Sequence, residues 1–312
     1  MLQKILLLLI IGSINNQAHG NDKTKSLKVL VTVDWEGHSL EKANVKAMQA
    51  IRRQFPQVPM LHYLNAAYFT KPQANKEEVS RRINSTLLPG DRHGLHIHGW
   101  KTLVEGAGVK WQQAPAWSSI KTSPCSFDCG HAVPIFNYSS DELVDIIDYS
   151  IQLLTDAGYQ FPVDFRSGGW VARANVLEAL VRSGFRTDSS AVAHELLEDE
   201  IGGSRLMGWL QEIWPETNIY SQPYSIETTF GSILELPNNG ALADYVSARE
   251  MIKVVNSNLS ALYKSNEDSR LVVIGFHLET AEDWQDRMMG ILDWLVKRGE
   301  RFGDIEFITS YP

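Results

Sequence analysis

The stretch LKVLVTVDWEG at residues 27–37 decides the fold class of this chain. Apolar and β-branched residues follow one another up to Val33, which is typical of a strand buried on both faces of a mostly parallel sheet. The run ends in two carboxylates, Asp34 and Glu36, which a spacing of two places on the same face of an ideal strand. Acids at the carboxyl end of such a strand lie where α/β barrels and open α/β sheets carry their chemistry. The alternative is an ordinary polar turn after a strand.

The rest of the chain alternates apolar runs with amphipathic stretches. Strands are predicted within residues 58–69, 93–100, 162–166, 185–189, 232–237, 271–277 and 305–309, and helices at 40–55, 77–88, 139–157, 172–182, 247–263 and 281–298. Residues 101–138 and 191–231 are predicted to be irregular, and the first is long enough to be a functional loop. This alternation, without a linker, predicts one α/β barrel-like domain over residues 27–312.

The composition is that of a soluble globular protein, with 44% hydrophobic and 21% charged residues in a chain of 312. The net charge of −8 and the lack of a long Lys/Arg run argue against a nucleic-acid partner. Residues 1–20 have the pattern of a signal peptide, with a cationic start, an apolar core at 5–11 and a small-residue end. We therefore expect an exported protein, periplasmic or secreted, without stable membrane insertion after cleavage. The alternative is an uncleaved anchor.

The two cysteines of the chain, Cys125 and Cys129, lie close together in the loop-like stretch SPCSFDCGH. In an oxidising compartment such a pair is most simply a local disulfide. The alternative is a metal site that uses both cysteines and His131, for which no fourth ligand is obvious.

Polar residues also follow the later predicted strands. His96 and His98 are two apart, so their imidazoles share one face, and two imidazoles with a carboxylate are a usual protein ligand set for catalytic zinc. They are otherwise ordinary cleft histidines. Arg166 ends a strand before Ser167-Gly168-Gly169-Trp170, where an arginine can hold a carboxylate and the backbone can approach a ligand. The alternative is an ion pair at a tight turn.

Two further strand ends carry weaker signals. Asp188-Ser189-Ser190 follows the predicted strand at 185–189, and taken alone it is an ordinary polar turn. His277 closes the apolar run LVVIGFH, and taken alone it is a core histidine. Each of these signals gains weight only from its place in the order of the others.

In order, VTVDWEG, HGLHIHGW, FRSGGW, TDSS and GFHLET resemble the five motifs of the polysaccharide deacetylases, carbohydrate esterase family 4 or the NodB-homology group, over residues 27–280. The resemblance implies a distorted (β/α)7-type barrel and a divalent metal, foremost Zn²⁺. It also implies a metal-dependent hydrolase that removes acetyl groups from an N- or O-acetylated oligo- or polysaccharide, in the cell envelope or outside the cell.

The resemblance also implies a role for each matched residue. Asp34 matches the catalytic base, Arg166 the residue that positions it, and His277 the general acid toward the leaving group. Glu36, His96 and His98 match the metal ligands. Substrate contacts are expected from Trp35, Trp100, Gly168, Gly169, Trp170 and Asp188.

Three departures mark a divergent branch. The first motif has Asp34-Trp35-Glu36 where the family commonly has Asp-Asp or Asp-x-Asp, and the histidines are two apart instead of four. Gly168-Gly169-Trp170 replaces an Arg-x-Pro-aromatic pattern in the third motif. These changes bear on the substrate more than on the metal chemistry. The alternatives are a non-catalytic carbohydrate-binding relative and a metal-dependent hydrolase of another C–N or glycosidic bond.

Overall fold

The computed structural model describes residues 25–118 and 128–311. The predicted signal peptide and Cys125 lie outside these residues, so the signal peptide and the pairing of Cys125 with Cys129 stay predictions. Among the described residues, none of the helices combines the length and the apolar character that a membrane crossing requires.

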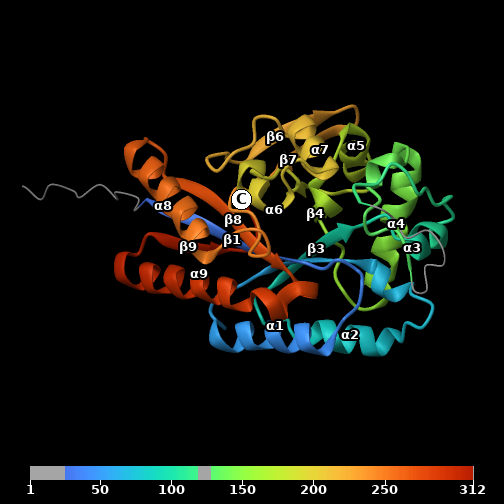
Figure 1. Cartoon of the computed structure of the whole chain (residues 1–312), viewed down its shortest axis with the longest axis horizontal. Coiled ribbons are helices and arrows are strands. Elements are labelled where there is room, and N and C mark those ends of the chain that lie inside the picture. Colours follow the sequence, from blue (N-terminus) through green and yellow to red (C-terminus); the bar gives the residue numbers. More distant parts are fainter. Residues whose placement is uncertain (1–24, 119–127, 312) are drawn as a thin grey trace, which may run out of the picture.

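One sheet of nine strands forms the centre of the described part of the chain (Figure 1). Its strands are β1 (Ser26–Asp34), β2 (Leu61–Leu64), β3 (Arg92–Ile97), β4 (Asp164–Ser167), β5 (Thr187–Asp188), β6 (Tyr224–Thr228), β7 (Gly231–Glu235), β8 (Ser269–His277) and β9 (Ile305–Ile308). Their order is β6-β7-β5-β4-β3-β2-β1-β8, with β9 beside β1. All pairs are parallel except the β6–β7 hairpin, so the carboxyl ends of the central strands share one rim.

The chain after β7 closes this sheet into a barrel. Gly240 N donates to Val273 O (2.9 Å), Ala243 N donates to Gly275 O (2.8 Å), and Leu242 bridges Gly275 of β8. On the opposite side, residue 238 pairs with residue 192 after β5. The ring β1, β2, β3, β4, β5, β7 with its continuation, and β8 gives seven strand positions, which confirms the predicted α/β fold and its distorted barrel.

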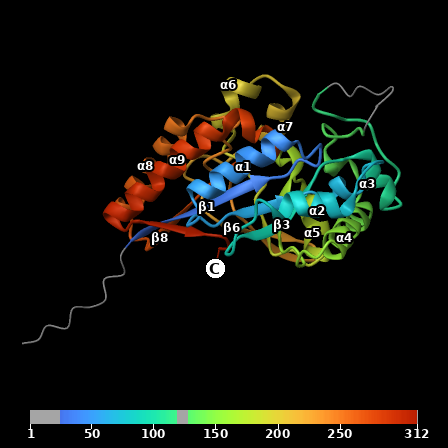
Figure 2. The same cartoon turned by 90° about the horizontal axis from the view of Figure 1, so that it is seen from below.

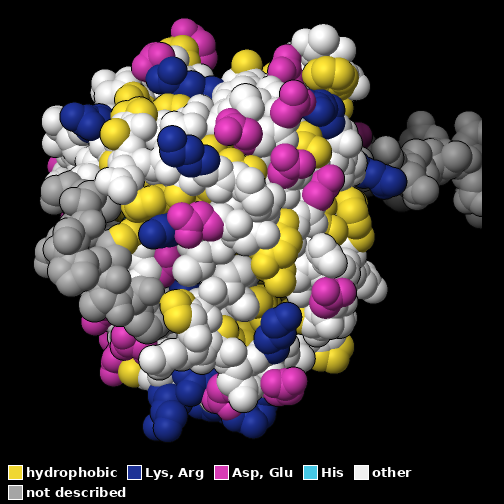
Figure 3. Space-filling view, turned by 90° about the vertical axis from the view of Figure 1, so that its right-hand side faces the viewer, with side chains coloured by type: hydrophobic (Ala, Val, Ile, Leu, Met, Phe, Trp, Pro, Cys, Tyr) yellow, Lys and Arg dark blue, Asp and Glu magenta, His cyan; other side chains and the backbone are white. Residues whose placement is uncertain are grey.

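Helices cover the outside of the barrel. Helices α1 (Lys42–Gln54), α2 (Lys76–Asn84), α8 (Ala248–Lys264) and α9 (Ala281–Phe302) lie on the side seen in Figure 2, and α1 packs against α9. Helix α4 (Ser140–Asp156) packs against α5 (Ala174–Arg182). The predicted capping box at Ser139 and Glu142 opens α4. The face in Figure 3 intersperses acidic and basic side chains.

The two segments that were predicted to be irregular contain short elements. Helix α3 (Lys101–Gly106) lies in the first, and α6 (Glu198–Ile201), α7 (Arg205–Ile213) and β6 lie in the second. The prediction that these parts are irregular was therefore wrong where these elements lie. These helices bury only a few apolar residues each, such as Leu103 and Val104 in α3, so they are too short for a helical period to show in the sequence.

Candidate active site

A narrow pocket of about 50 Å³ opens at the carboxyl ends of β1, β3, β4 and β8. It is lined by Asp34, Glu36, His96, His98, Trp117, His131, Ser167, Gly169, Trp170, Leu206, Tyr245 and His277. Asp34 at the end of β1 and Glu36 two residues later thus both line the pocket, as their spacing predicts. Because parallel strands end at one rim, residues from distant motifs meet here.

Glu36 lies at the centre of four imidazoles. Its Oε1 lies 3.1 Å from His96 Nε2, and its Oε2 lies 3.0 Å from His98 Nε2 and 2.5 Å from His131 Nε2. His277 Nε2 approaches Oε1 to 3.3 Å. Ligand atoms of Glu36, His98 and His131 lie within 4.8 Å of one another, which is close enough to share one ion.

Backbone carbonyls fix the orientation of two of these rings. His96 Nδ1 donates to Arg166 O (2.8 Å), and His98 Nδ1 donates to His131 O (2.7 Å). In neutral imidazoles this assigns the proton to Nδ1 and turns the lone pair of Nε2 toward Glu36, as in metal-binding histidines. His98 Nε2 is buried without a hydrogen-bond partner. A lone pair that faces a carboxylate at this distance needs a cation or a proton between them.

The charge states agree with a metal site. Burial would raise the pKa of Glu36, but His98 and His277 hold that pKa well below its ordinary value, so Glu36 is a carboxylate. Burial, with His98, lowers the pKa of His131, against the effect of Glu36, so His131 is neutral at pH 7, the form in which an imidazole can bind a metal. One carboxylate and two imidazoles are a usual set for a divalent metal such as zinc that keeps an open position. The residues present fit that group.

His131 was not expected in this cluster. Sequence reasoning grouped it with the two cysteines, whereas the structure stacks its ring on that of His98 at 4.3 Å. The cause is a close crossing of two backbone segments, because a Cβ on Gly130 would lie 2.0 Å from Gly99 O. Gly130 also has a φ of 115°, which favours glycine. The only sequence signal was a glycine next to a histidine in a long loop.

Arg166 fixes Asp34 from the other side of the pocket. Its NH1 donates to Asp34 Oδ1 (2.8 Å) and to Thr32 Oγ1 (2.9 Å), and its Nε donates to Ser189 O (2.9 Å). The guanidinium carbon also lies 4.6 Å from the ring centre of Tyr63. Arg166 is fully buried, so these contacts hold the planar fork in one orientation. An arginine that holds a carboxylate is what the sequence predicted here.

His277 has a carboxylate partner that the sequence did not reveal. Its Nδ1 lies 3.3 Å from Asp244 Oδ1, and its backbone N donates to Asp244 Oδ2 (3.0 Å). Burial would lower the pKa of His277, but Asp244 and Glu36 raise that pKa to about 10. Asp244 comes from the segment that closes the barrel, and no motif or period marks it in the sequence.

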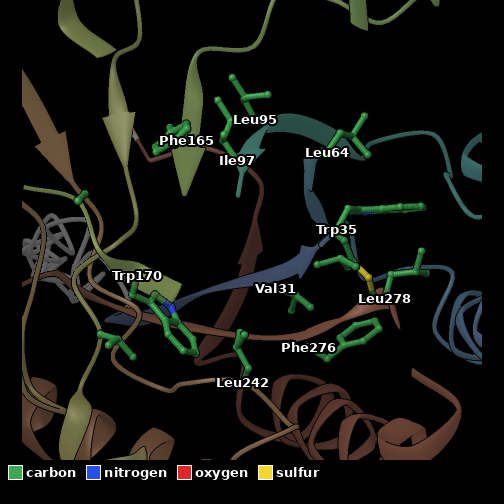
Figure 4. Close-up of a cluster of buried hydrophobic side chains, with 14 of the residues drawn as sticks. Val31, Trp35, Leu64, Leu95, Ile97, Phe165, Trp170, Leu242, Phe276 and Leu278 are labelled. Atoms are coloured by element: carbon green, nitrogen blue, oxygen red, sulfur yellow. The ribbon is translucent and has the colours of Figure 1, made fainter. Parts of the chain in front are cut away.

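Four residues expected to contact substrate, Trp35, Trp100, Gly168 and Asp188, do not line the pocket. Trp35 lies between Asp34 and Glu36, directly after β1, and it points away from the pocket into the core beside Leu64 and Leu278 (Figure 4). Its indole Nε1 donates to His62 Nδ1 (3.2 Å), and it is 0% exposed. The expectation for Trp35 is therefore corrected.

Trp100 and Asp188 are buried and do not line the pocket. Trp100 is buried, and its Nε1 donates to Glu36 O (2.8 Å), while Glu36 N donates to Glu279 Oε2 (3.1 Å). Trp100 thus holds the backbone of Glu36, which corrects the expected sugar contact. Asp188 is fully buried beside β7 and does not line the pocket either. Of the expected set, Gly169 and Trp170 do line it.

Gly168 supports His98 by leaving room for its ring. A Cβ at position 168 would lie 2.7 Å from three ring atoms of His98, which is closer than side chains pack. We expect Gly168→Ala to displace His98 and to weaken Zn²⁺ binding by about 10- to 100-fold, the usual effect of disturbing a ligand's support. Competition against a zinc-sensitive dye measures this. Gly208→Ala in α7, where a Cβ meets nothing within 4 Å, is the matched control, and equal affinity of both variants contradicts the prediction.

Comparison with known proteins identifies the fold. No family model and no curated protein sequence matches the chain. A crystal structure described as a polysaccharide deacetylase from Mycobacterium smegmatis matches with a TM-score of 0.52 and 14% identity, over 90% of this chain and 86% of that one. The Puue allantoinase matches with a TM-score of 0.51 and 11% identity, over 92% and 88% of the two chains.

A family 4 carbohydrate esterase from Streptomyces lividans, solved with acetate, matches at a TM-score of 0.42 and 10% identity, over 92% of each chain. The likeness to the Mycobacterium smegmatis structure, at a TM-score of 0.52, confirms at the level of fold the resemblance drawn from the five motifs. At these identities the likeness shows the fold alone, and the chemistry depends on the residues of the pocket.

Proposed function

We propose that this protein is a metal-dependent hydrolase that removes acetyl groups from an acetylated glycan outside the cytoplasm. One observation carries the proposal: Glu36, His98 and His131 converge on one point, with Asp34 on one side and His277 on the other. Glu36, His98 and His131 would hold the ion, and His96 Nε2 lies next to them, 3.1 Å from Glu36 Oε1. In this ligand set His131 takes the place of His96, which the motifs imply as a ligand.

The roles of the remaining groups follow from their geometry. A divalent metal, when bound, polarises an acyl carbonyl and makes water a better nucleophile near neutral pH. Asp34 is the base that accepts the proton of the attacking water, and Arg166 holds its other face so that one oxygen stays available. His277, held by Asp244, donates a proton to the departing nitrogen or oxygen.

The size of the pocket supports an acetyl group as the part that enters. About 50 Å³ is too small for a sugar ring but fits a carbonyl and a methyl group. Trp117, Trp170 and Leu206 give this space apolar walls, which suit a methyl group. The sugar itself would stay at the mouth of the pocket.

The test is acetate release from partially acetylated chitosan and from peptidoglycan fragments by the mature chain. We expect release that EDTA removes and that added Zn²⁺ restores. His131→Ala should need far more Zn²⁺ for the same rate, while Lys253→Ala on α8 should behave like the wild type. Tight glycan binding without acetate release under any metal would contradict the proposal and favour the non-catalytic relative.

A second candidate is hydrolysis of another C–N bond. The fold likeness to the Puue allantoinase and the small size of the pocket favour it. Allantoin is therefore included as a substrate in the same assay. Turnover of allantoin without acetate release from either glycan would select this candidate.

A further inference from the structure

Two carboxyl groups face each other inside the protein, behind the pocket. Asp188 on β5 and Glu235 on β7 are register partners on neighbouring parallel strands, so their side chains point to the same side of the sheet. Both residues are fully buried. The roles proposed above use neither of them. Two adjacent buried carboxylates repel each other strongly, so this arrangement needs an explanation.

Neighbouring groups donate hydrogen bonds to two of the four carboxyl oxygens of the pair. Ser190 Oγ donates to Asp188 Oδ1 (2.6 Å), and Ala191 N donates to Glu235 Oε1 (2.9 Å). The remaining oxygens, Asp188 Oδ2 and Glu235 Oε2, are buried without a hydrogen-bond partner. Since a carboxylate oxygen only accepts, the two carboxyls can hydrogen-bond each other only when one of them carries a proton.

We propose that Asp188 and Glu235 share one proton at neutral pH and that this protonated pair is a positioning device for the end of β4. Glu235 is the protonated member and donates to the Asp188 carboxylate. Every donor and acceptor in the group is then satisfied. The inference concerns the chain's own hydrogen bonds, and only its effect on turnover rests on the proposed function.

A short hydrogen-bonded path connects the pair to the pocket. Ser190 Oγ, which donates to Asp188, accepts from the backbone N of Ser167 (2.9 Å) at the end of β4. Ser167 lines the pocket, and the preceding residue, Arg166, holds Asp34 and accepts from His96 Nδ1 through its carbonyl. The position of Ser190 therefore affects Asp34 and His96, because Arg166, which contacts both, is the residue next to Ser167.

The surrounding charges leave the pair without a full counter-charge. Arg166 is the cation that acts on both acids, but its hydrogen bonds go to Asp34, Thr32 and Ser189. Tyr224 faces the pair from β6, and burial with both acids raises its pKa, so it stays neutral. On α5, which packs against β7, Glu178 and Arg182 are engaged with Thr229 and Asp141.

Burial raises the pKa of Asp188 to about 6 and raises that of Glu235 well above its ordinary value, with Asp188 adding to the effect on Glu235. A carboxyl with a raised pKa in the folded state loses stabilising free energy as the pH rises from the unfolded pKa. Glu235→Gln keeps the donor to Asp188 but cannot ionise. The wild type should therefore lose stability relative to Glu235→Gln as the pH rises. We expect the unfolding equilibrium constant of the wild type, divided by that of Glu235→Gln, to rise about tenfold per pH unit above pH 5.

Urea unfolding from pH 5 to pH 8 measures this ratio. Glu227→Gln, an exposed glutamate on β6, is the matched control and should follow the wild type at every pH. A ratio for Glu235→Gln that does not change with pH overturns the shared proton. The double variant Asp188→Asn with Glu235→Gln would place two amide groups face to face, and we expect it to be less stable than either single variant.

A second experiment tests the positioning role with Zn²⁺ alone as the probe. Asp188→Ala should weaken Zn²⁺ binding by about tenfold and lower kcat without changing KM, whereas Asp188→Asn, which can still accept from Ser190, should restore both. A folded Asp188→Ala protein with wild-type Zn²⁺ affinity overturns this role. If the wild type releases no acetate at all, the proposed function fails, but the unfolding and Zn²⁺ measurements still decide the inference.

Discussion

Replacing Asp34 with Asn is expected to lower kcat for acetate release by roughly 10²- to 10⁴-fold, the range that loss of a general base produces. An amide oxygen can still accept the hydrogen bond that Arg166 NH1 donates at 2.8 Å, so the side chain keeps its place. It cannot take up the proton of the attacking water. The measurement is the initial rate at saturating chitosan with added Zn²⁺.

Two further measurements make this result specific. Zn²⁺ affinity and the urea midpoint of Asp34→Asn should match those of the wild type, because Asp34 is not among the residues that converge on the ion. Asp283→Asn, an exposed acid in the first turn of α9, controls for the loss of one negative charge. Turnover within tenfold of the wild type would remove Asp34 from the role of base and leave Glu279 or Asp244 to be tested in its place.

The sequence predicted the parts of the fold that repeat a simple period. β1 and β8 are long and apolar because both their faces are covered, and the capping box of α4 is a local signal that needs no tertiary contact. The acids and imidazoles of the pocket could be predicted because parallel strands bring their carboxyl ends together. Strand position is thus enough to place Asp34, Glu36 and His96 near one another.

The rest of the site depends on segments without a period. His131 reaches Glu36 because two glycines allow backbones to cross, and Asp244 reaches His277 because residues 238–243 pair with β8. Neither event leaves a pattern in the sequence. The prediction that Trp35 contacts substrate was wrong because it followed from the neighbouring Asp34 and Glu36. Side chains alternate along an extended chain, so Trp35 points into the core instead.

Asp244, which comes from the segment that closes the barrel, contacts His277, so a substitution of Asp244 tests whether His277 acts as the general acid. Burial would lower the pKa of His277, and Asp244 is the strongest influence that raises it, to about 10. Asp244→Asn removes that charge but keeps a group that can accept from the backbone N of His277, which now donates at 3.0 Å. We expect the pKa of His277 to fall by about one unit or more.

A general acid works only while it is protonated, so the alkaline limb of kcat should move toward neutral pH by the same amount in Asp244→Asn. Stability gives an independent reading. The raised pKa of His277 contributes stability that is complete below about pH 6.5 and is lost as the pH rises through about 10, so the variant should differ most from the wild type below that window. An alkaline limb that stays in place while the low-pH stability falls would show that Asp244 only supports the fold. Since the alkaline limb reports the protonation of the acid itself, movement of both readings together would identify His277 as the group that donates to the leaving atom.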